Sequence, residues 1–359
     1  SALATWPQRG IPDSPEAWLL TVARNRSIDR IRRDSRLVIT DEVPDMADPT
    51  SYDPNGTDDR LKLLFVCAHP AIDETLHTPL MLQTVLGLEA KDIARAYLTS
   101  PSAMAQRLVR AKRKIKTAKI PFVLPDPEDY PARIGAVLEA VYGAYSMDWM
   151  AADGEFSHEA FFLSTVLSDL MPNNAEALGL TALIGLVEAR RGARMRDGVL
   201  VPLPEQDTEH WDSALIDRSV SLLNRAAQQQ CVGRFQIEAA IQSVHAARQV
   251  TGRTDWRALS QLYGGLVRIY PTIGGAVSQA AAVAEDAGPD EGLALLDRIR
   301  FPGSDSYQPA HAVRAQCLAR LGRLAEAASA YERAISLCTD IPSRHWLEQQ
   351  FAALKTRSS

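Results

Sequence analysis

The chain has 359 residues, a formal net charge of −5, 46% hydrophobic residues and 23% charged residues. This length predicts two or three domains, and the composition excludes a chain that is disordered throughout. The sequence contains neither a run of eighteen apolar residues nor a charged start followed by an apolar run, so we expect no membrane span and no secretory signal. The four cysteines form no Cys-x-x-Cys pair, which argues against a zinc knuckle and favours the reducing cytoplasm.

The charge is distributed unevenly along the chain. Residues 1–122 contain 18 Lys and Arg against 15 Asp and Glu, whereas residues 123–359 contain 21 against 29. The segment 105–119 holds seven basic residues and no acidic one: Arg107, Arg110, Lys112, Arg113, Lys114, Lys116 and Lys119. Such a one-sided cluster in an acidic protein favours a polyanionic partner, nucleic acid above all.

The first predicted helix runs from Ser14 to about Ser35. Ser14 can cap it and Pro15 suits its first position, and six arginines lie beside its apolar stripe. The segment 41–59 has seven acids, three prolines and no basic residue, which predicts a flexible acidic linker. We therefore place a first domain at 1–38 and this linker at 39–57.

The remainder of the chain reads as helical. A helical block covers 58–120, four prolines mark a linker at 121–132, and helix-length apolar patterns fill 133–355. One hairpin is expected around Gly198–Pro202, with the polar runs 194–198 and 205–207 interpreted as solvated surface. The predicted fold class is all-α.

A spacing typical of helical repeats occurs near the C-terminus. Gly288 and Gly322 lie 34 residues apart, each followed by a helix rich in Ala and Leu, and this is the tetratricopeptide period. In the last unit Gly322, Ala327, Tyr331 and Ala334 have the repeat's spacing. The pattern predicts a tetratricopeptide-like region over 133–355, with an ordinary helical bundle as the alternative.

The most informative stretch is 89–117, which predicts a helix-turn-helix. Ala94 is the small residue at the crossing, Ser100 caps the second helix, and Pro101 opens it. The second helix has a buried stripe of Met104, Leu108, Ala111 and Ile115.

The other side of this helix is expected to contact DNA. Residues near the start of such a helix reach base edges in the major groove, and later basic residues contact phosphates. Base readout is assigned to Ser102, Ala105 and Gln106, and mainly phosphate contact to Arg107, Arg110, Arg113 and Lys114. For each single residue the alternative is a solvated helix face.

Two segments together resemble a known family. Residues 15–33 (PEAWLLTVARNRSIDRIRR) are similar to the end of sigma region 2, and 88–116 resemble sigma region 4, in the same order and separated by an acidic linker. Extracytoplasmic-function RNA polymerase sigma factors have this plan, and one branch carries a long tetratricopeptide-like C-terminal extension.

The resemblance implies a transcription initiation factor. Its region 4 would read the minus-35 element of promoter DNA, and residues 7–33 would recognise and open the minus-10 element, with support from the amide of Asn25 and the basic residues Arg26, Arg30 and Arg33. The partners would be promoter DNA and core RNA polymerase. Only the last residues of the polymerase-binding helices, 2–6, are in this sequence, so we expect that binding to be weakened or lost.

Other functions fit the sequence less well. The sequence has no Gly-rich phosphate loop, no His-Glu-x-x-His and no Gly-x-Ser-x-Gly, so we expect no enzyme, cofactor or metal site. A conventional helix-turn-helix regulator with a helical sensor half is the alternative, and a pure repeat scaffold is a third. We also hypothesise that the acidic C-terminal half packs on the sigma-like domains and regulates them.

Overall fold

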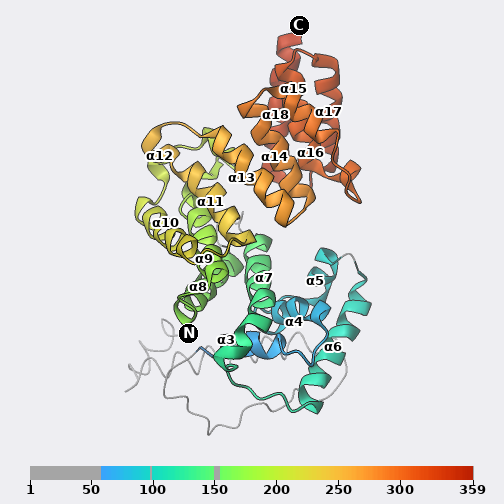
Figure 1. The fold of residues 1–359 in the computed structure, drawn as a ribbon. Helices are drawn as coiled ribbons and strands as arrows, with labels where there is room; N and C mark the ends of the chain where they lie inside the picture. The colour runs from blue at the N-terminus through green and yellow to red at the C-terminus, as the bar shows by residue number, and fades with distance from the viewer. Residues whose placement is uncertain (1–57, 98, 149–153, 359) are drawn as a thin grey trace, which may run out of the picture. The chain divides into compact units, whose positions relative to one another are not determined.

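Residues 58–97, 99–148 and 154–358 are described by the computed structural model (Figure 1). The predicted helix at 14–35, the linker at 39–57, and the four residues Asn25, Arg26, Arg30 and Arg33 lie outside these residues. Across the described part, the protein is helical apart from one two-stranded hairpin, which confirms the predicted all-α class. None of the described helices combines the length and the apolar character that crossing a membrane requires.

The first described block contains four α-helices and one short 3-10 helix. Asp58 begins it by accepting a hydrogen bond from the backbone N of Arg60 at 2.9 Å, which satisfies an otherwise unpaired N–H at the helix start. Asp73 caps the 3-10 helix in the same way. The elements are α3 (Asp59–Cys67), η2 (Glu74–Leu76), α4 (His77–Thr84), α5 (Ala90–Ala96) and α6 (Pro101–Thr117).

The predicted linker at 121–132 does not separate two cores. After η3 (Pro127–Asp129), helix α7 (Tyr130–Asp148) begins inside this range and packs against α4 and α3. The ring of Tyr130 lies 5.2 Å from that of Phe65, measured between centroids. One cluster of buried apolar side chains runs from Leu61 in α3 to Phe235 and Ala239 further along the chain. The block at 58–120 therefore shares its core with the start of the C-terminal region.

Helix α9 lies at the centre of the middle region. It is α9 (Ala175–Glu188), and it packs against α8 (Glu155–Leu170), α10 (Ser213–Gln228) and α11 (Arg234–Ala246). Two glycines allow these close crossings, because a Cβ at Gly185 would lie 2.3 Å from Oγ of Ser219 and one at Gly179 would lie 2.8 Å from the backbone N of Gln236. Almost every side chain of α9 is buried.

A β-hairpin follows α9, where the sequence predicted one. Its strands are β1 (Met195–Arg196) and β2 (Val199–Leu200), antiparallel with Met195 opposite Leu200. Asp197 and Gly198 form the turn with φ of 52° and 77°, as a tight Asp-Gly hairpin turn requires. Short 3-10 helices flank the hairpin: η4 (Arg191–Ala193), η5 (Leu203–Glu205) and η6 (Thr208–His210).

The last third of the chain is a series of helices in which each packs against the next from α13 onward. Gly322 ends α16 in the left-handed conformation, with φ of 74°, and Ala327, Tyr331 and Ala334 are buried in the following helix. The elements are α12 (Arg248–Thr251), α13 (Trp256–Ile269), α14 (Ile273–Asp286), α15 (Pro289–Leu296), η7 (Ser304–Ser306), α16 (Gln308–Arg320), α17 (Leu324–Leu337) and α18 (Ile341–Ser358). Most of them contribute to a second core cluster between Val277 and Leu354.

Candidate nucleic-acid interface and buried-arginine pocket

The helices α5 and α6 form a pair joined by a short turn at the predicted place. The side-chain oxygen of Ser100 accepts a hydrogen bond from the backbone N of Ala103 at 3.2 Å, and Pro101 is the first residue of α6. Ala94 is fully buried where the helices meet. The predicted stripe is also buried, since Met104, Leu108, Ala111 and Ile115 are all less than 8% exposed.

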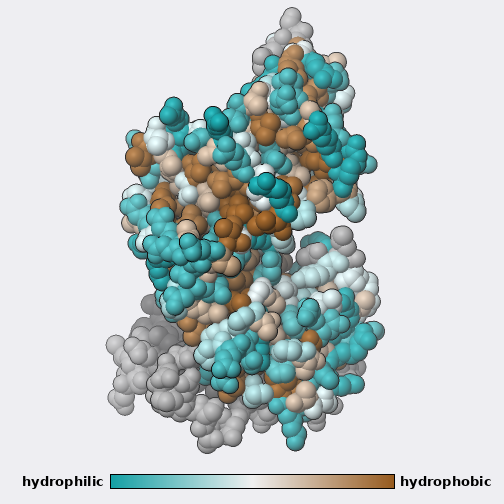
Figure 2. Space-filling view, in the orientation of Figure 1, coloured by the Kyte–Doolittle hydropathy of each residue, from teal (hydrophilic) through white to brown (hydrophobic). Residues whose placement is uncertain are grey.

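The outward side of α6 carries the residues predicted to contact DNA. Ser102, Gln106, Arg110, Arg113 and Lys114 are exposed. Figure 2 shows hydrophilic side chains over this helix. Two predicted residues, Ala105 and Arg107, are half-buried.

Arg107 differs from the other cations of α6 because it is held in place. Its Nη2 donates a hydrogen bond to Oγ1 of Thr75 in η2 at 3.0 Å. The hydroxyl of Thr75 in turn donates to Asp73 at 2.6 Å. Arg107 therefore attaches the first half of α6 to η2, a structural contact that the sequence did not indicate.

The positive charge of α6 is not neutralised by neighbouring side chains. Within the described residues, none of the seven Lys and Arg between 107 and 119 forms an ion pair. Lys114 and Lys116 lie in the last turn, where the helix dipole favours cations. Helix α6 packs chiefly against α5, with smaller contacts to α4 and η2, so the C-terminal helices do not make a substantial contact with it. Within the part of the chain that the structure describes, this charged face is not covered by another helix.

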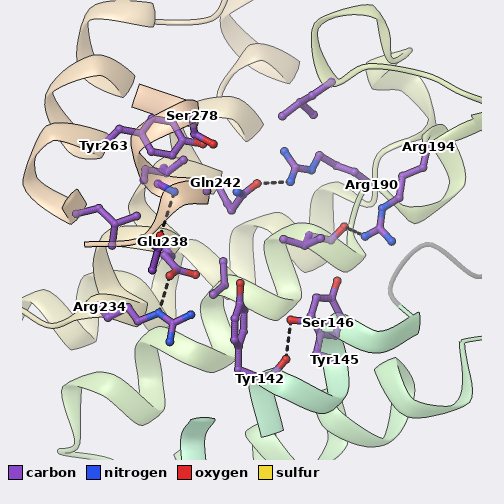
Figure 3. A pocket seen from close by; sticks show the side chains of 18 of the residues that line it. Tyr142, Tyr145, Ser146, Arg190, Arg194, Arg234, Glu238, Gln242, Tyr263 and Ser278 are labelled. Carbon is purple, nitrogen blue, oxygen red and sulfur yellow. Dashed lines mark hydrogen bonds and ion pairs between the residues drawn. The ribbon is translucent and has the colours of Figure 1, made fainter. Parts of the chain in front are cut away.

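A second candidate site lies in the C-terminal region. A cavity of about 570 Å³ is lined by side chains from α7, α9, the segment after β2, α11, α13 and α14. Figure 3 shows Arg190, Gln242 and Glu238 in this cavity, with tyrosines on opposite sides of it. Four tyrosines line it: Tyr142, Tyr145, Tyr263 and Tyr270.

Arg190 is a buried cation without a carboxylate partner among the described residues. It is only 5% exposed. Its Nη2 donates to Oε1 of Gln242, whereas its Nη1 has no hydrogen-bond partner. Burial and the neighbouring Arg194 cation lower the pKa of Arg190 to about 10. A buried charge with an unsatisfied donor is energetically costly, so a bound water, ion or ligand that satisfies this donor would stabilise the site.

The ion pairs at the side of the cavity are satisfied, in contrast to Arg190. Arg234 donates to Glu238 at 2.7 Å and to Glu139 at 2.6 Å. Its guanidinium also lies 4.0 Å from the ring centroid of Tyr270 and 4.8 Å from that of Tyr142. Burial raises the pKa of Glu238 and raises that of Tyr142 to about 12. This cluster joins α7, α11 and the end of α13 into a fixed wall.

The interpretation of 194–198 and 205–207 as solvated surface is wrong for two residues. Arg194 is 5% exposed and Gln206 is 7% exposed, and both line the cavity. Arg196, Asp197, Glu205 and Asp207 are exposed, as expected. Sequence reasoning missed Arg190, Gln242 and Tyr263 altogether, because they lie far apart in the chain and no local motif marks them.

The fold and these sites define an all-α protein that combines an exposed cationic helix with a largely apolar cavity that contains a buried arginine. Residues 133–227 match a family described as a family of unknown function (DUF6596), and this segment contributes Tyr142, Tyr145, Arg190 and Gln206 to the cavity. No solved structure matches the chain significantly.

The chain belongs to the same family as the uncharacterized protein R00370 of Rhizobium meliloti (strain 1021). The two are 36% identical over 371 residues, which cover 97% of this chain and 86% of that protein. The similarity thus extends over both the helix pair and the C-terminal region.

Proposed function

We propose that this protein is a sigma-type transcription initiation factor that binds promoter DNA through α5 and α6. The observation that carries the proposal is the exposed cationic face of α6, which forms no ion pair with the described residues and lies opposite a buried apolar stripe. A helix of this kind fits the major groove, where its first residues reach base edges and its later cations reach phosphates. Ser102 and Gln106 would read bases, and Arg110, Arg113 and Lys114 would contact mainly phosphates.

The C-terminal region is proposed to regulate the DNA-binding pair. Support comes from the core that α7 shares with α3 and α4. A shift of α7 would displace α4, and α4 contacts both α5 and α6. The acidic balance of residues 123–359 adds an electrostatic contribution to this proposal. Tetratricopeptide-like packing from α13 to α18 would offer a further surface for a partner.

Run-off transcription tests the proposal directly. Core RNA polymerase and fragmented genomic DNA are incubated with and without the natural full-length protein, including any polymerase-binding helices that precede this sequence, and the transcripts are sequenced. An initiation factor gives new transcripts that begin at a shared upstream motif and need no other sigma factor. DNA binding without initiation would favour the conventional helix-turn-helix regulator, and the absence of both would exclude both functions.

A further inference from the structure

We propose that the cavity around Arg190 binds a small organic acid with one carboxylate and an apolar, ring-containing body. This inference goes beyond DNA binding and does not depend on it. It rests on three features of the cavity: an unpaired buried cation, an unpaired buried acceptor, and largely apolar or aromatic walls.

The cation supplies the anchor for a carboxylate. Arg190 is the residue immediately before η4, and its guanidinium reaches toward Gln242 in the cavity (Figure 3). Its Nη1 is free, and no described carboxylate is close enough to pair with it. Guanidinium and carboxylate groups form short, charge-assisted hydrogen bonds in a planar geometry. A ligand carboxylate would satisfy Nη1 and compensate the buried charge.

The apolar and aromatic walls of the cavity favour an apolar body for the ligand that carries this carboxylate. The apolar lining comes from Leu183, Val187, Leu200, Val201 and Leu266, and four tyrosines add aromatic surface. Pockets of this size that are mostly apolar with a few convergent polar groups typically bind small organic molecules. Figure 2 shows apolar surface gathered near α11 and α13, two of the helices that border the cavity.

Gln206 adds a second polar contact. Its Nε2 donates to the carbonyl of Val201 at 3.1 Å, and its Oε1 is buried without a partner. A ligand hydroxyl or amine could donate to this oxygen. Arg190 and Gln206 come from the two ends of the hairpin segment, so a bound ligand would connect the end of α9 to the segment after β2.

The test compares an acid with its neutral analogue on the full chain. Isothermal titration calorimetry measures the Kd of 2-naphthoate and of 2-naphthamide, which have the same shape. The expected result is that the acid binds about 10- to 100-fold more tightly, as a charged hydrogen bond implies. Equal affinities, no binding below 1 mM, or binding of inorganic phosphate but not of the naphthoate would each overturn the proposal.

Variants locate the binding site. Arg190→Met keeps the side-chain length and removes the charge, so it should abolish the preference for the acid, whereas Arg218→Met on the exposed face of α10 should leave it unchanged. Hydrogen exchange of the wild-type chain gives an answer even if Arg190→Met fails to fold. The acid should slow exchange over 183–206 and 234–242, and protection confined to other segments would overturn the assignment.

Discussion

Nη2 of Arg107 donates a hydrogen bond to Oγ1 of Thr75 at 3.0 Å, across 32 residues of sequence. This contact divides the cations of α6 into two kinds. Arg107 is half-buried and serves to position the helix, while Arg110, one turn later, is exposed and has only a weak contact with the carbonyl of Gln106 at 3.4 Å. The sequence had assigned the same role to both.

Arg110 is expected to contact a phosphate in the proposed complex. Replacing it by Ala should weaken duplex binding and lower the slope of log K against log salt concentration by about one unit, because one fewer counterion is released. Fluorescence anisotropy at several salt concentrations measures the slope. Arg218→Ala, on an exposed face of α10, is the matched control and should not change it. An unaltered slope for Arg110→Ala would remove this residue from the interface.

Because α4 and α7 share one core, a destabilising substitution in α4 should also destabilise α7. Leu80 is fully buried in that core, and Leu80→Ala should cost about 2–5 kcal/mol of stability, as large-to-small core substitutions do. Hydrogen exchange should then accelerate in α7 as well as in α4. Acceleration limited to residues 58–120 would mean that this block unfolds independently of the C-terminal region.

Two glycines offer a matched pair of stability tests. A Cβ at Gly292 in α15 would lie 2.5 Å from Cβ of Ala284, whereas one at Gly265 in α13 would meet no atom within 4 Å. Gly265→Ala should stabilise the protein by roughly 0.5–1 kcal/mol through helix propensity. Gly292→Ala should lower the Tm despite the same gain, because α14 and α15 must separate. If both changes raised the Tm, the close crossing of these helices would be refuted.

His245 predicts a specific dependence of stability on pH. It is 9% exposed, and burial together with the Arg190 and Arg248 cations lowers its pKa to about 3, against about 6.5 in an unfolded chain. The unfolded state therefore binds the extra proton first as the pH falls. The stability contributed by neutral His245 is complete above pH 6.5 and is lost toward pH 3, with a slope of up to about 1.4 kcal/mol per pH unit.

Urea denaturation between pH 7 and pH 5 measures this loss. His245→Phe keeps a ring for the edge contact with Trp256, whose centroid lies 6.0 Å away, and should flatten the dependence. His210→Phe, at an exposed position, is the control. Identical slopes for wild type and His245→Phe would contradict the buried neutral imidazole.

The helix pair could be predicted because its signals are local. The cap at Ser100, the proline at 101 and the apolar spacing from Met104 to Ile115 all lie within sixteen residues, and each describes a single helix. The helical class and a hairpin near Gly198 were predictable for the same reason. These features depend on backbone preferences that neighbouring residues determine.

The cavity and the shared core could not be predicted in this way. The prolines at 121–131 indicate a boundary between helices, but they say nothing about whether α7 returns to pack on α4. Arg190, Gln206 and Gln242 are charged or amide residues, which are usually solvated, yet Arg190 and Gln206 are buried and Gln242 is half-buried. Their burial follows from tertiary packing, which a single sequence does not display.

Site-specific crosslinking tests the central claim most directly. A photo-crosslinking amino acid replaces Gln106 on the outward side of α6, and in a second protein it replaces Gln261, an exposed position of α13. On irradiation with duplex DNA at low salt, position 106 should crosslink to bases and position 261 should not. Crosslinking at 106 that is no greater than at 261 would contradict a DNA-binding role for this helix.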